Sequence, residues 1–196
     1  MTEYSFGLMQ KPHFSEYICF EGLFLPHETD RINALWNSET SSEAAVINRN
    51  EQTENDTLRK SSVMFLHNNE EHNWIYEKIA GVAQHANYQF YGFDLQGIAE
   101  PLQLAEYSDG GFFEWHMDFG AGAISHRKLS ITVQLSDPED YEGGELQFMI
   151  NNTVEAAPAK KGTVVIFPSF VLHRVTPITR GLRRSIVGWV SGMPYR

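Results

Sequence analysis

Two short segments in the first half of the chain carry apolar residues at helical spacing. Residues 25–36 begin with a proline and acidic residues before their apolar positions start, and residues 69–83 carry Glu70 and Glu71 near their beginning. Proline suits the first turn of a helix, and carboxylates complement the positive end of its dipole. We therefore expect two amphipathic helices. Their apolar positions are Ile32, Leu35 and Trp36 in the first segment and Ile75, Ile79 and Val82 in the second.

The segment between these helices, residues 38–62, is polar and rich in Asn, Thr, Ser and Glu. A connection of this length without predicted structure of its own is typical of functional loops. We therefore expect a long loop that acts as a lid over a site.

From Phe90 onward the pattern changes to short runs rich in aromatic and β-branched residues, separated by Gly, Pro, Asp and Asn. Such runs with frequent turn residues predict a mainly β fold, a sandwich or jelly roll with the helices packed on its outside. No internal repeat, low-complexity tail or composition break marks a second domain, so we expect one domain over residues 1–196. The clearest predicted strands are 129–136, 144–150, 162–169 and 184–191.

The composition narrows the classes of protein. A length of 196 residues with 42% hydrophobic residues is enough for one buried core. The formal net charge of -10 disfavours nucleic acid, whose phosphates need clustered Lys and Arg. The chain has no apolar run near the roughly 18 residues of a membrane span, no signal-peptide pattern at its start, and a single cysteine, Cys19. We expect a soluble cytoplasmic protein without nucleic-acid or membrane partners, and nothing in the composition indicates an oligomeric state.

The candidate chemistry begins with His116 and Asp118, which interrupt the aromatic run GGFFEWHMDFG. Residues i and i+2 of a strand point to the same face, so the two side chains would project side by side. An imidazole or a carboxylate in an apolar strand needs a partner. A hydrogen-bonded polar pair in the sheet would also explain these two residues. A metal site therefore requires a third ligand.

His173 is the third candidate ligand, because it closely follows a buried-looking strand that ends at Pro168. Taken alone, a histidine here would more often be a core residue. Together with His116 and Asp118 it gives two imidazoles and one carboxylate. This is the facial triad of non-haem Fe(II) oxygenases, which leaves positions open on one side of the metal. Fe(II) is therefore the expected metal.

Ten residues after His173, Arg183 and Ser185 share one face of a predicted strand. An Arg fork beside a hydroxyl is suited to bind a carboxylate through paired, charged hydrogen bonds. This arrangement implies a dicarboxylate cosubstrate. Arg184 would point to the other face, where we expect a surface charge.

Three ordered segments, YSDGGFFEWHMD, LSDPEDYEGGELQF and FPSFVLHRVTPITRGLRRS, resemble the iron- and 2-oxoglutarate-dependent oxygenase superfamily. Within it, the chain is most similar to prolyl 4-hydroxylase-like enzymes of the bacterial and viral type. The resemblance covers about residues 90–192 and implies that they form a double-stranded β-helix. Residues 1–89 match only loosely, as helices and strands that support this core.

The resemblance also implies roles for individual residues. It assigns Fe(II) to the triad described above and a carboxylate of 2-oxoglutarate to Arg183. Tyr107 stands where relatives place a tyrosine that touches the cosubstrate, with packing in the barrel as the alternative. Gln134 shares a strand face that would line the same pocket. Arg59 follows the polar loop, where relatives often place a residue that faces the substrate, although we expect a solvated surface charge there.

The reaction follows from the same resemblance. Fe(II), 2-oxoglutarate and O2 would be required, with ascorbate as an optional addition, and a C–H bond would be hydroxylated with release of succinate and CO2. Peptidyl proline is the first expectation for the substrate, and a free amino acid or small metabolite is the second. Animal collagen hydroxylases carry lysine where Arg183 stands, which argues against a collagen-like substrate. A non-catalytic jelly-roll binding module is the alternative outside the enzymes, and it would need neither triad nor clamp.

Overall fold

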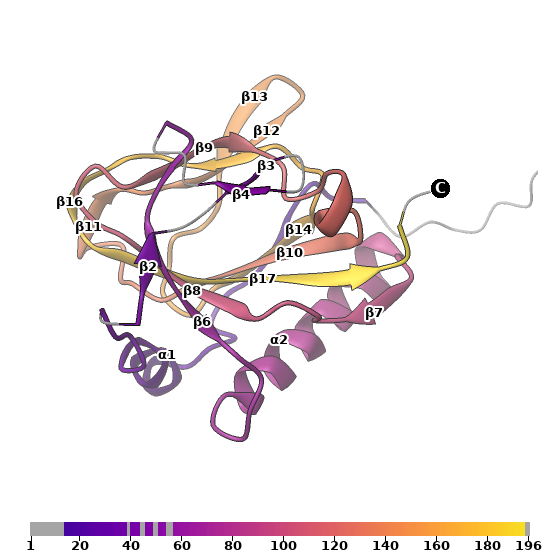
Figure 1. Cartoon of the computed structure of the whole chain (residues 1–196), viewed down its shortest axis with the longest axis horizontal. Coiled ribbons are helices and arrows are strands. Elements are labelled where there is room, and N and C mark those ends of the chain that lie inside the picture. The colour runs from indigo at the N-terminus through magenta and orange to yellow at the C-terminus, as the bar shows by residue number, and fades with distance from the viewer. Residues whose placement is uncertain (1–13, 39, 44–45, 49–50, 54–56, 195–196) are drawn as a thin grey trace, which may run out of the picture.

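The computed structural model of the chain describes residues 14–194, except 39, 44–45, 49–50 and 54–56. Its strands form two main sheets, and both helices lie on the outer side of one of them (Figure 1). This agrees with the predicted mainly β fold with flanking helices. Within the described part of the chain, no helix is long and apolar enough to span a membrane.

The larger sheet has the strand order β1-β14-β10-β17-β8-β6-β2, and β7 pairs with β17 beside this path. Its centre is antiparallel: Thr132 of β10 is paired with Val165 on one side and with Val187 on the other. The bounds are β1 Ile18–Phe20, β2 Ser42–Glu43, β6 Ser62–Leu66, β7 Leu95–Gly97, β8 Leu102–Tyr107, β10 Arg127–Gln134, β14 Val164–Pro168 and β17 Arg183–Gly192.

The smaller sheet has the order β13-β12-β15-β9-β5, and two separate strand pairs, β11-β16 and β3-β4, accompany it. The bounds are β3 Val46–Asn48, β4 Glu51–Thr53, β5 Arg59–Lys60, β9 Phe112–His116, β11 Tyr141–Gly143, β12 Leu146–Ile150, β13 Thr153–Ala156, β15 His173–Val175 and β16 Ile178–Gly181. The four strands predicted most clearly are therefore present as β10, β12, β14 and β17, with ends displaced by no more than two residues.

Both predicted helices form, but their ends differ from the expectation. The first, α1, spans Pro26–Asn33 and stops before the last predicted apolar residues. The second, α2, spans Asn73–Ala86 and continues into a π-helical turn, η1, at Asn87–Tyr91. Glu70 and Glu71 lie before α2, because the side chain of Asn69 accepts hydrogen bonds from the backbone N–H groups of Glu71 and His72 and so forms a turn there.

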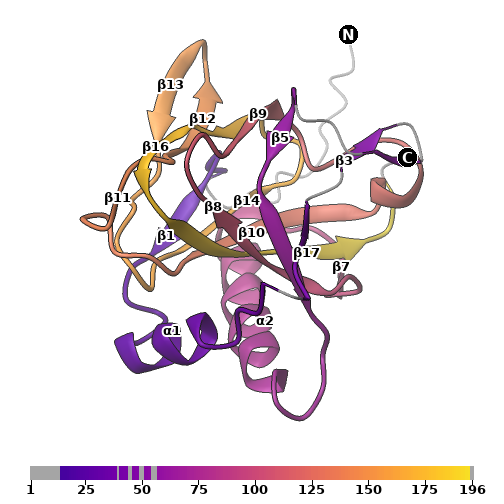
Figure 2. The ribbon, with the colours of Figure 1, turned by 60° about the vertical axis from the view of Figure 1, so that its left-hand side comes forward.

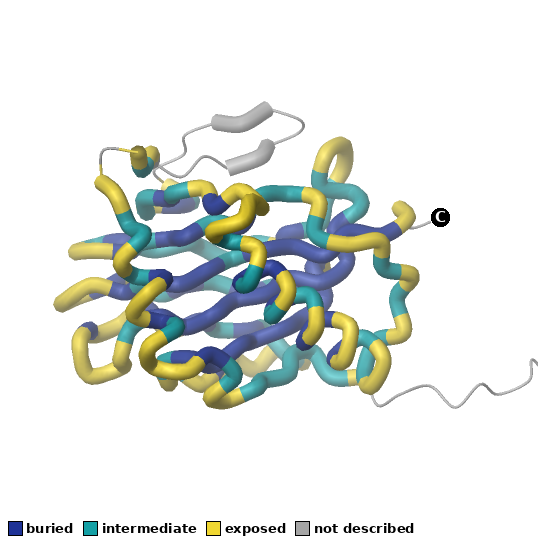
Figure 3. The backbone as a smooth tube through the Cα atoms, turned by 90° about the horizontal axis from the view of Figure 1, so that it is seen from below, coloured by how far each residue is buried: buried dark blue, intermediate teal, exposed yellow. Residues whose placement is uncertain are grey.

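The two faces of the larger sheet bury two different cores. The outer face packs against α1 and α2, whose Ile32, Ile75 and Ile79 are fully buried with Ile131 and Ile186 of the sheet. The inner face packs toward the smaller sheet. Figure 3 shows buried residues running through the middle of the strands, with exposed residues at the turns. The core residues between the sheets include Ala105, Tyr107, Phe148, Val165 and Phe167.

The predicted loop over residues 38–62 is not a structureless connection. It contains β2, the β3-β4 pair, β5 and the first residue of β6. Strand β5 joins the edge of the smaller sheet beside β9 (Figure 2), whereas β6 joins the larger sheet beside β8. The polar composition concealed these strands because each is short, and because β2, β5 and β6 pair with segments distant in the chain. Residues 39, 44–45, 49–50 and 54–56 lie outside the described residues, and the lid remains a prediction.

Candidate metal centre and active site

Three side chains with metal-binding atoms meet between the two sheets. His116 is the last residue of β9 and lies directly opposite His173, the first residue of β15. The sequence predicts that Asp118 shares the strand of His116, but β9 ends at His116 and Asp118 lies beyond it. The backbone N–H of Phe119, the next residue, donates to the carbonyl of Ser169. The chain nevertheless brings the carboxylate back to the two imidazoles, and the three ligand atoms lie within 4.8 Å of one another.

Both imidazoles present the same nitrogen to the carboxylate. His116 Nε2 lies 3.6 Å from Asp118 Oδ1, and His173 Nε2 lies 3.6 Å from Asp118 Oδ2. His116 Nδ1 lies 2.7 Å from the carbonyl of Glu114, and His173 Nδ1 lies 2.9 Å from the carbonyl of Val171. A carbonyl oxygen can only accept, so each Nδ1 carries the proton and each Nε2 keeps its lone pair free. Two neutral imidazoles and a carboxylate fixed in this way form the donor set that Fe(II) requires.

The carboxylate of Asp118 is held by groups from the larger sheet. Ser130 Oγ donates a hydrogen bond of 2.6 Å to Asp118 Oδ2 and lies 3.0 Å from Ser169 Oγ. Arg127 donates to the backbone carbonyl of Asp118 and is itself held by Glu100, with Arg127 Nε 2.7 Å from Oε1 of that residue. These contacts fix the direction of the carboxylate before any metal binds.

Replacing Ser130 with alanine should weaken Fe(II) or Mn(II) binding by roughly 10- to 100-fold, the usual cost of losing a group that orients a metal ligand. The substitution removes the hydroxyl bonded to Asp118 and leaves all three ligands in place. Calorimetric titration with Mn(II) would measure the effect. Ser191→Ala is the matched control, because Ser191 is also buried but its Oγ has no hydrogen-bond partner among the described residues. Equal affinities in the two variants would contradict the orienting role.

The surroundings favour the deprotonated forms of His116 and Asp118. Burial, reinforced by the nearby His173, lowers the pKa of His116 from 6.5 to about 3. Burial would raise the pKa of Asp118, but His173, His116, Arg127 and the hydrogen bond from Ser130 outweigh it and lower that pKa from 3.8 to about 2. Both shifts favour the forms that bind a metal ion.

The metal-free protein should lose stability as the pH falls from about 6.5 toward 3. In this window His116 binds a proton in the unfolded protein but not in the folded protein, so a fall in pH favours the unfolded state. The contribution is fully present above pH 6.5, and Asp118 adds a loss of the same sign below about pH 3.8. The melting temperature in the presence of a chelator, measured against pH, would show the decline. It should flatten in His116→Gln but not in His126→Gln, and equal slopes in all three proteins would contradict this explanation.

Arg183, the first residue of β17, is 1% exposed. Its Nη2 donates a hydrogen bond of 2.9 Å to Gln134 Oε1, and its Nη1 lies 3.5 Å from Ser185 Oγ, which is long for a hydrogen bond. The buried Nε has no partner, and no carboxylate among the described residues pairs with this guanidinium. A buried cation without a counterion is costly, so the site favours an anionic ligand.

One pocket between the sheets is lined by both the triad and Arg183. Strand β10 connects its two ends, because Ser130 contacts Asp118 and Gln134 contacts Arg183. The four residue steps of strand from Ser130 to Gln134 span about 13 Å at roughly 3.3 Å per residue. Since side chains reach inward from both ends, the space between them suits a short dicarboxylate that contacts the triad at one end and Arg183 at the other.

The remaining predicted cosubstrate residues surround this guanidinium. Tyr107 lies opposite Arg183 in the pairing of β8 with β17, and the guanidinium carbon is 5.5 Å from the centre of its ring. Ser185 and Tyr107 both line the pocket. Gln134, in contrast, contacts Arg183 through its side-chain oxygen, which positions the guanidinium. Direct contact of these three residues with a cosubstrate remains a prediction.

The expected alternation along β17 holds. Arg183, Ser185, Val187 and Trp189 line the pocket, whereas Ile186 is buried in the core beneath the helices. Arg184 faces away from the pocket, as predicted, but it is not a solvated surface charge. Its Nη2 lies 2.6 Å from Glu106 Oε2, and the guanidinium lies over the ring of Trp36. Long-range pairing of β17 with β8 brings Glu106 beside Arg184, which composition could not reveal.

Arg59 is also placed differently from the expectation. It is 7% exposed, lines the pocket and lies with its guanidinium carbon 4.7 Å from the centre of the Phe113 ring. The cause is β5, in which Arg59 is paired directly with Phe113 of β9. The structure therefore adds a buried cation to the pocket that the sequence had assigned to the surface.

Residues 102–191 match the model of the 2OG-Fe(II) oxygenase superfamily. The chain is 39% identical over 105 residues to a PKHD-type hydroxylase of Cupriavidus metallidurans, covering 50% of this chain and 46% of that protein. It is 40% identical over 90 residues to a PKHD-type hydroxylase of Synechococcus sp. strain CC9902, covering 46% and 40%. The chain thus spans less than half the length of these relatives.

Solved structures show the same fold over nearly the whole chain. A Pseudomonas putida prolyl-4-hydroxylase has a TM-score of 0.73 at 18% identity, covering 91% of this chain and 93% of that one. A Trichoplax adhaerens prolyl hydroxylase, in complex with a peptide fragment of the hypoxia inducible factor oxygen degradation domain, has a TM-score of 0.75 at 15% identity, covering 90% and 84%. These likenesses identify the two facing, open sheets as the predicted double-stranded β-helix core.

Proposed function

We propose that this chain, whose residues 102–191 match the model of the 2OG-Fe(II) oxygenase superfamily, is a member of that superfamily and a prolyl 4-hydroxylase-like enzyme. In this proposal it hydroxylates a C–H bond and releases succinate and CO2. The observation that carries the proposal is the convergence of His116, Asp118 and His173, whose ligand atoms lie within 4.8 Å of one another in a pocket that also contains Arg183. A non-catalytic jelly-roll module would need neither feature.

Each residue of the site has a task in this reaction. His116, Asp118 and His173 would hold Fe(II) from one side and leave its other positions to ligands. Arg183 would bind the distal carboxylate of 2-oxoglutarate and so direct the 2-oxo acid end toward the metal. Tyr107 would add a further contact to the cosubstrate.

When bound, Fe(II) would activate O2, which is the oxidant, and 2-oxoglutarate would supply two electrons: one oxygen atom of O2 would enter succinate as CO2 leaves, and the other would enter the substrate as a hydroxyl group. The protein contributes orientation and a site from which water is largely excluded. The inner faces of both sheets provide that environment, since Phe148 and Phe167 beside the triad are buried. Ascorbate would be an optional addition.

Peptidyl proline is the substrate that we propose first. The support is the likeness to prolyl hydroxylase structures, one of which is in complex with a peptide. A free amino acid or small metabolite is the second candidate. We further propose a single domain, with residues 1–89 supporting a core at 90–192, in a cytoplasmic protein without nucleic-acid partners; the net charge of -10 and the single cysteine support this setting.

The proposal is tested by product analysis. Protein loaded with Fe(II) would be incubated in air with 2-oxoglutarate and either proline-containing peptides or a pool of free amino acids. Mass spectrometry should detect a product that has gained one oxygen atom, with succinate formed in equal amount. Protein that binds Fe(II) and 2-oxoglutarate but forms neither product nor succinate from any of these compounds would contradict the proposed activity. Succinate and product with free amino acids alone would replace peptidyl proline by the second candidate.

A further inference from the structure

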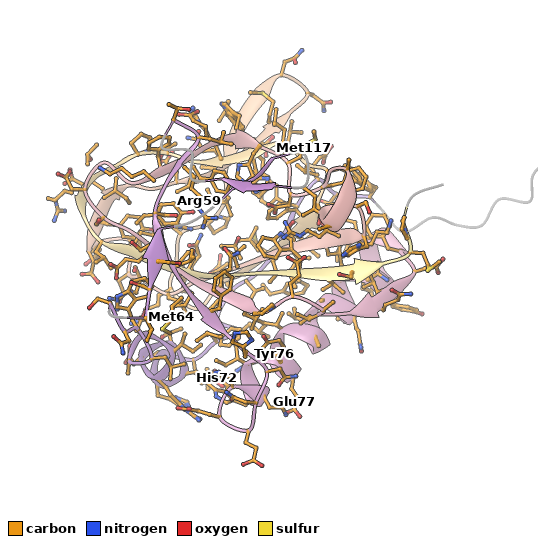
Figure 4. The ribbon with its side chains drawn as sticks, viewed as in Figure 1. Arg59, Met64, His72, Tyr76, Glu77 and Met117 are labelled. Atoms are coloured by element: carbon orange, nitrogen blue, oxygen red, sulfur yellow. The ribbon has the colours of Figure 1, made fainter. Side chains whose placement is uncertain are left out.

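Arg59 brings a second guanidinium into the pocket, on the side of the metal ligands. In Figure 4 this residue of β5 lies between the two sheets. The rings of Phe113 and His116 are stacked, with centroids 3.4 Å apart, and the guanidinium carbon of Arg59 lies 4.7 Å from the centre of the same Phe113 ring. This cation and a metal ligand therefore contact the same aromatic ring. A polar group of a ligand bound beside the triad can therefore reach Arg59, whereas Arg183 lies at the far end of the pocket.

The guanidinium of Arg59 is held in place without being neutralised. Its Nε donates a hydrogen bond of 2.8 Å to Ser61 Oγ, which fixes the side chain but supplies no charge. Among the described residues, no carboxylate forms an ion pair with Arg59, and Asp118 is the only acidic residue lining the pocket. Arg127, the other buried arginine near the triad, is by contrast paired with Glu100. Within the described part of the chain, the terminal nitrogens of Arg59 thus lack an acidic partner.

The charges of the loaded site leave this cation uncompensated. The two charges of Fe(II) and the one of Arg183 would be balanced by Asp118 and the two carboxylates of 2-oxoglutarate. Arg59 would then remain as one excess positive charge that is 7% exposed. Keeping such a charge out of water is costly unless a hydrogen-bonded anion joins it. An anionic group on the substrate would supply that partner.

We propose that Arg59 binds a carboxylate of the substrate, so that the enzyme acts on an acidic compound. This inference rests on the proposed function and narrows its substrate class. The carboxylate lies close to the carbon that is hydroxylated, because Arg59 lines the same pocket as the triad and contacts the Phe113 ring on which His116 is stacked. It belongs either to a free amino acid or to an Asp or Glu side chain beside the reacting residue of a peptide. The planar fork of arginine suits a carboxylate in two-point contact.

The test is competitive binding from a defined mixture. The probes are the twenty free amino acids, their amides, and blocked peptides of the form acetyl-X-Pro-Z-amide with all residues at X and Z. Protein loaded with Mn(II) and 2-oxoglutarate under nitrogen would be equilibrated with the mixture, and bound compounds identified by mass spectrometry. Captured compounds should carry a carboxylate, with at least about tenfold enrichment over the matched amide, Asn or Gln compounds. Enrichment of free acids indicates an amino acid, and enrichment of Asp or Glu peptides indicates a peptide.

Three variants show whether the preference depends on this side chain. Arg59→Gln should lose the enrichment, and Arg59→Lys should keep part of it, because lysine retains the charge without the fork. Lys60→Gln is the matched control: it removes one positive charge from the same strand, at an exposed residue whose Nζ contacts the carbonyl of Asp109. That variant should behave like the unmodified protein. The affinity for 2-oxoglutarate, measured by calorimetry, should be the same in all of them.

The outcomes separate this inference from the proposed function. Equal capture of acids and amides, capture of nothing, or an enrichment that survives Arg59→Gln would overturn the role of Arg59 while 2-oxoglutarate binding stays intact. A large loss of 2-oxoglutarate affinity in Arg59→Gln would also overturn it, because the residue would then serve the cosubstrate. Failure of the unmodified protein to bind 2-oxoglutarate in the presence of Mn(II) would overturn both proposals.

Discussion

Replacing His173 with alanine should weaken Fe(II) or Mn(II) binding by more than the roughly 10- to 100-fold that loss of a ligand-orienting group costs. The substitution removes one of three protein ligands, and His116 and Asp118 alone offer too few donors to retain the ion. Asp118→Ala and His116→Ala should have effects of the same order. Calorimetric titration with Mn(II) in the absence of O2 would measure all three.

The controls for this prediction are two other histidines. His67 is exposed and His126 lies in a turn before β10, and neither belongs to the cluster of metal-binding side chains. His67→Ala and His126→Ala should bind Mn(II) as the unmodified protein does. Unchanged affinity in His173→Ala would rule out the triad, since this histidine is one third of the proposed ligand set.

Replacing Arg183 with alanine should raise the concentration of 2-oxoglutarate required for succinate release steeply, with metal binding nearly unchanged. Loss of one partner from a buried, charged hydrogen-bonded pair typically costs about 2–5 kcal/mol, a roughly 30- to several-thousand-fold change in affinity. Arg183→Lys should recover part of the loss, because it keeps the charge but not the planar fork. Initial rates of succinate release against 2-oxoglutarate concentration would give the values.

Arg184 is the natural comparison for Arg183 because it is the next residue and carries the same side chain. It faces away from the pocket and is paired with Glu106. Arg184→Ala should change the Michaelis constant for 2-oxoglutarate by only a few-fold, as expected for a partly exposed ion pair remote from the ligand. A larger defect in Arg184→Ala than in Arg183→Ala would contradict the assignment of the clamp.

The parts of the site that could be predicted from sequence are those in which local periodicity fixes direction. Alternation along β17 separates Arg183 from Arg184 without knowledge of any partner strand. The triad could be predicted from residue type and order alone, since an apolar strand does not accommodate an unpartnered imidazole or carboxylate. Asp118 was assigned to the wrong local structure, yet its spacing from His116 was short enough that either a strand or a turn could bring the two together.

The parts that could not be predicted depend on pairing between distant segments. Arg59 enters the pocket because β5, a strand of two residues inside a polar stretch, pairs with β9 more than fifty residues later in the chain. Glu106 reaches Arg184 through sheet pairing, and Ser130 reaches Asp118 because the segment after β9 is hydrogen-bonded to Ser169 beside β10. Neither contact leaves a local sequence pattern. The beginning of α2 depends on one hydrogen-bonded turn at Asn69 rather than on the apolar periodicity.

The central claim is that one pocket binds a metal ion and 2-oxoglutarate together. The most direct measurement is a calorimetric titration of 2-oxoglutarate into the protein under nitrogen, once with Mn(II) and once with a chelator. If the triad and Arg183 act as described, 2-oxoglutarate binds at one molecule per chain in the presence of Mn(II) and far more weakly without it. Equal affinity with and without the metal, or no binding in either case, would contradict the claim.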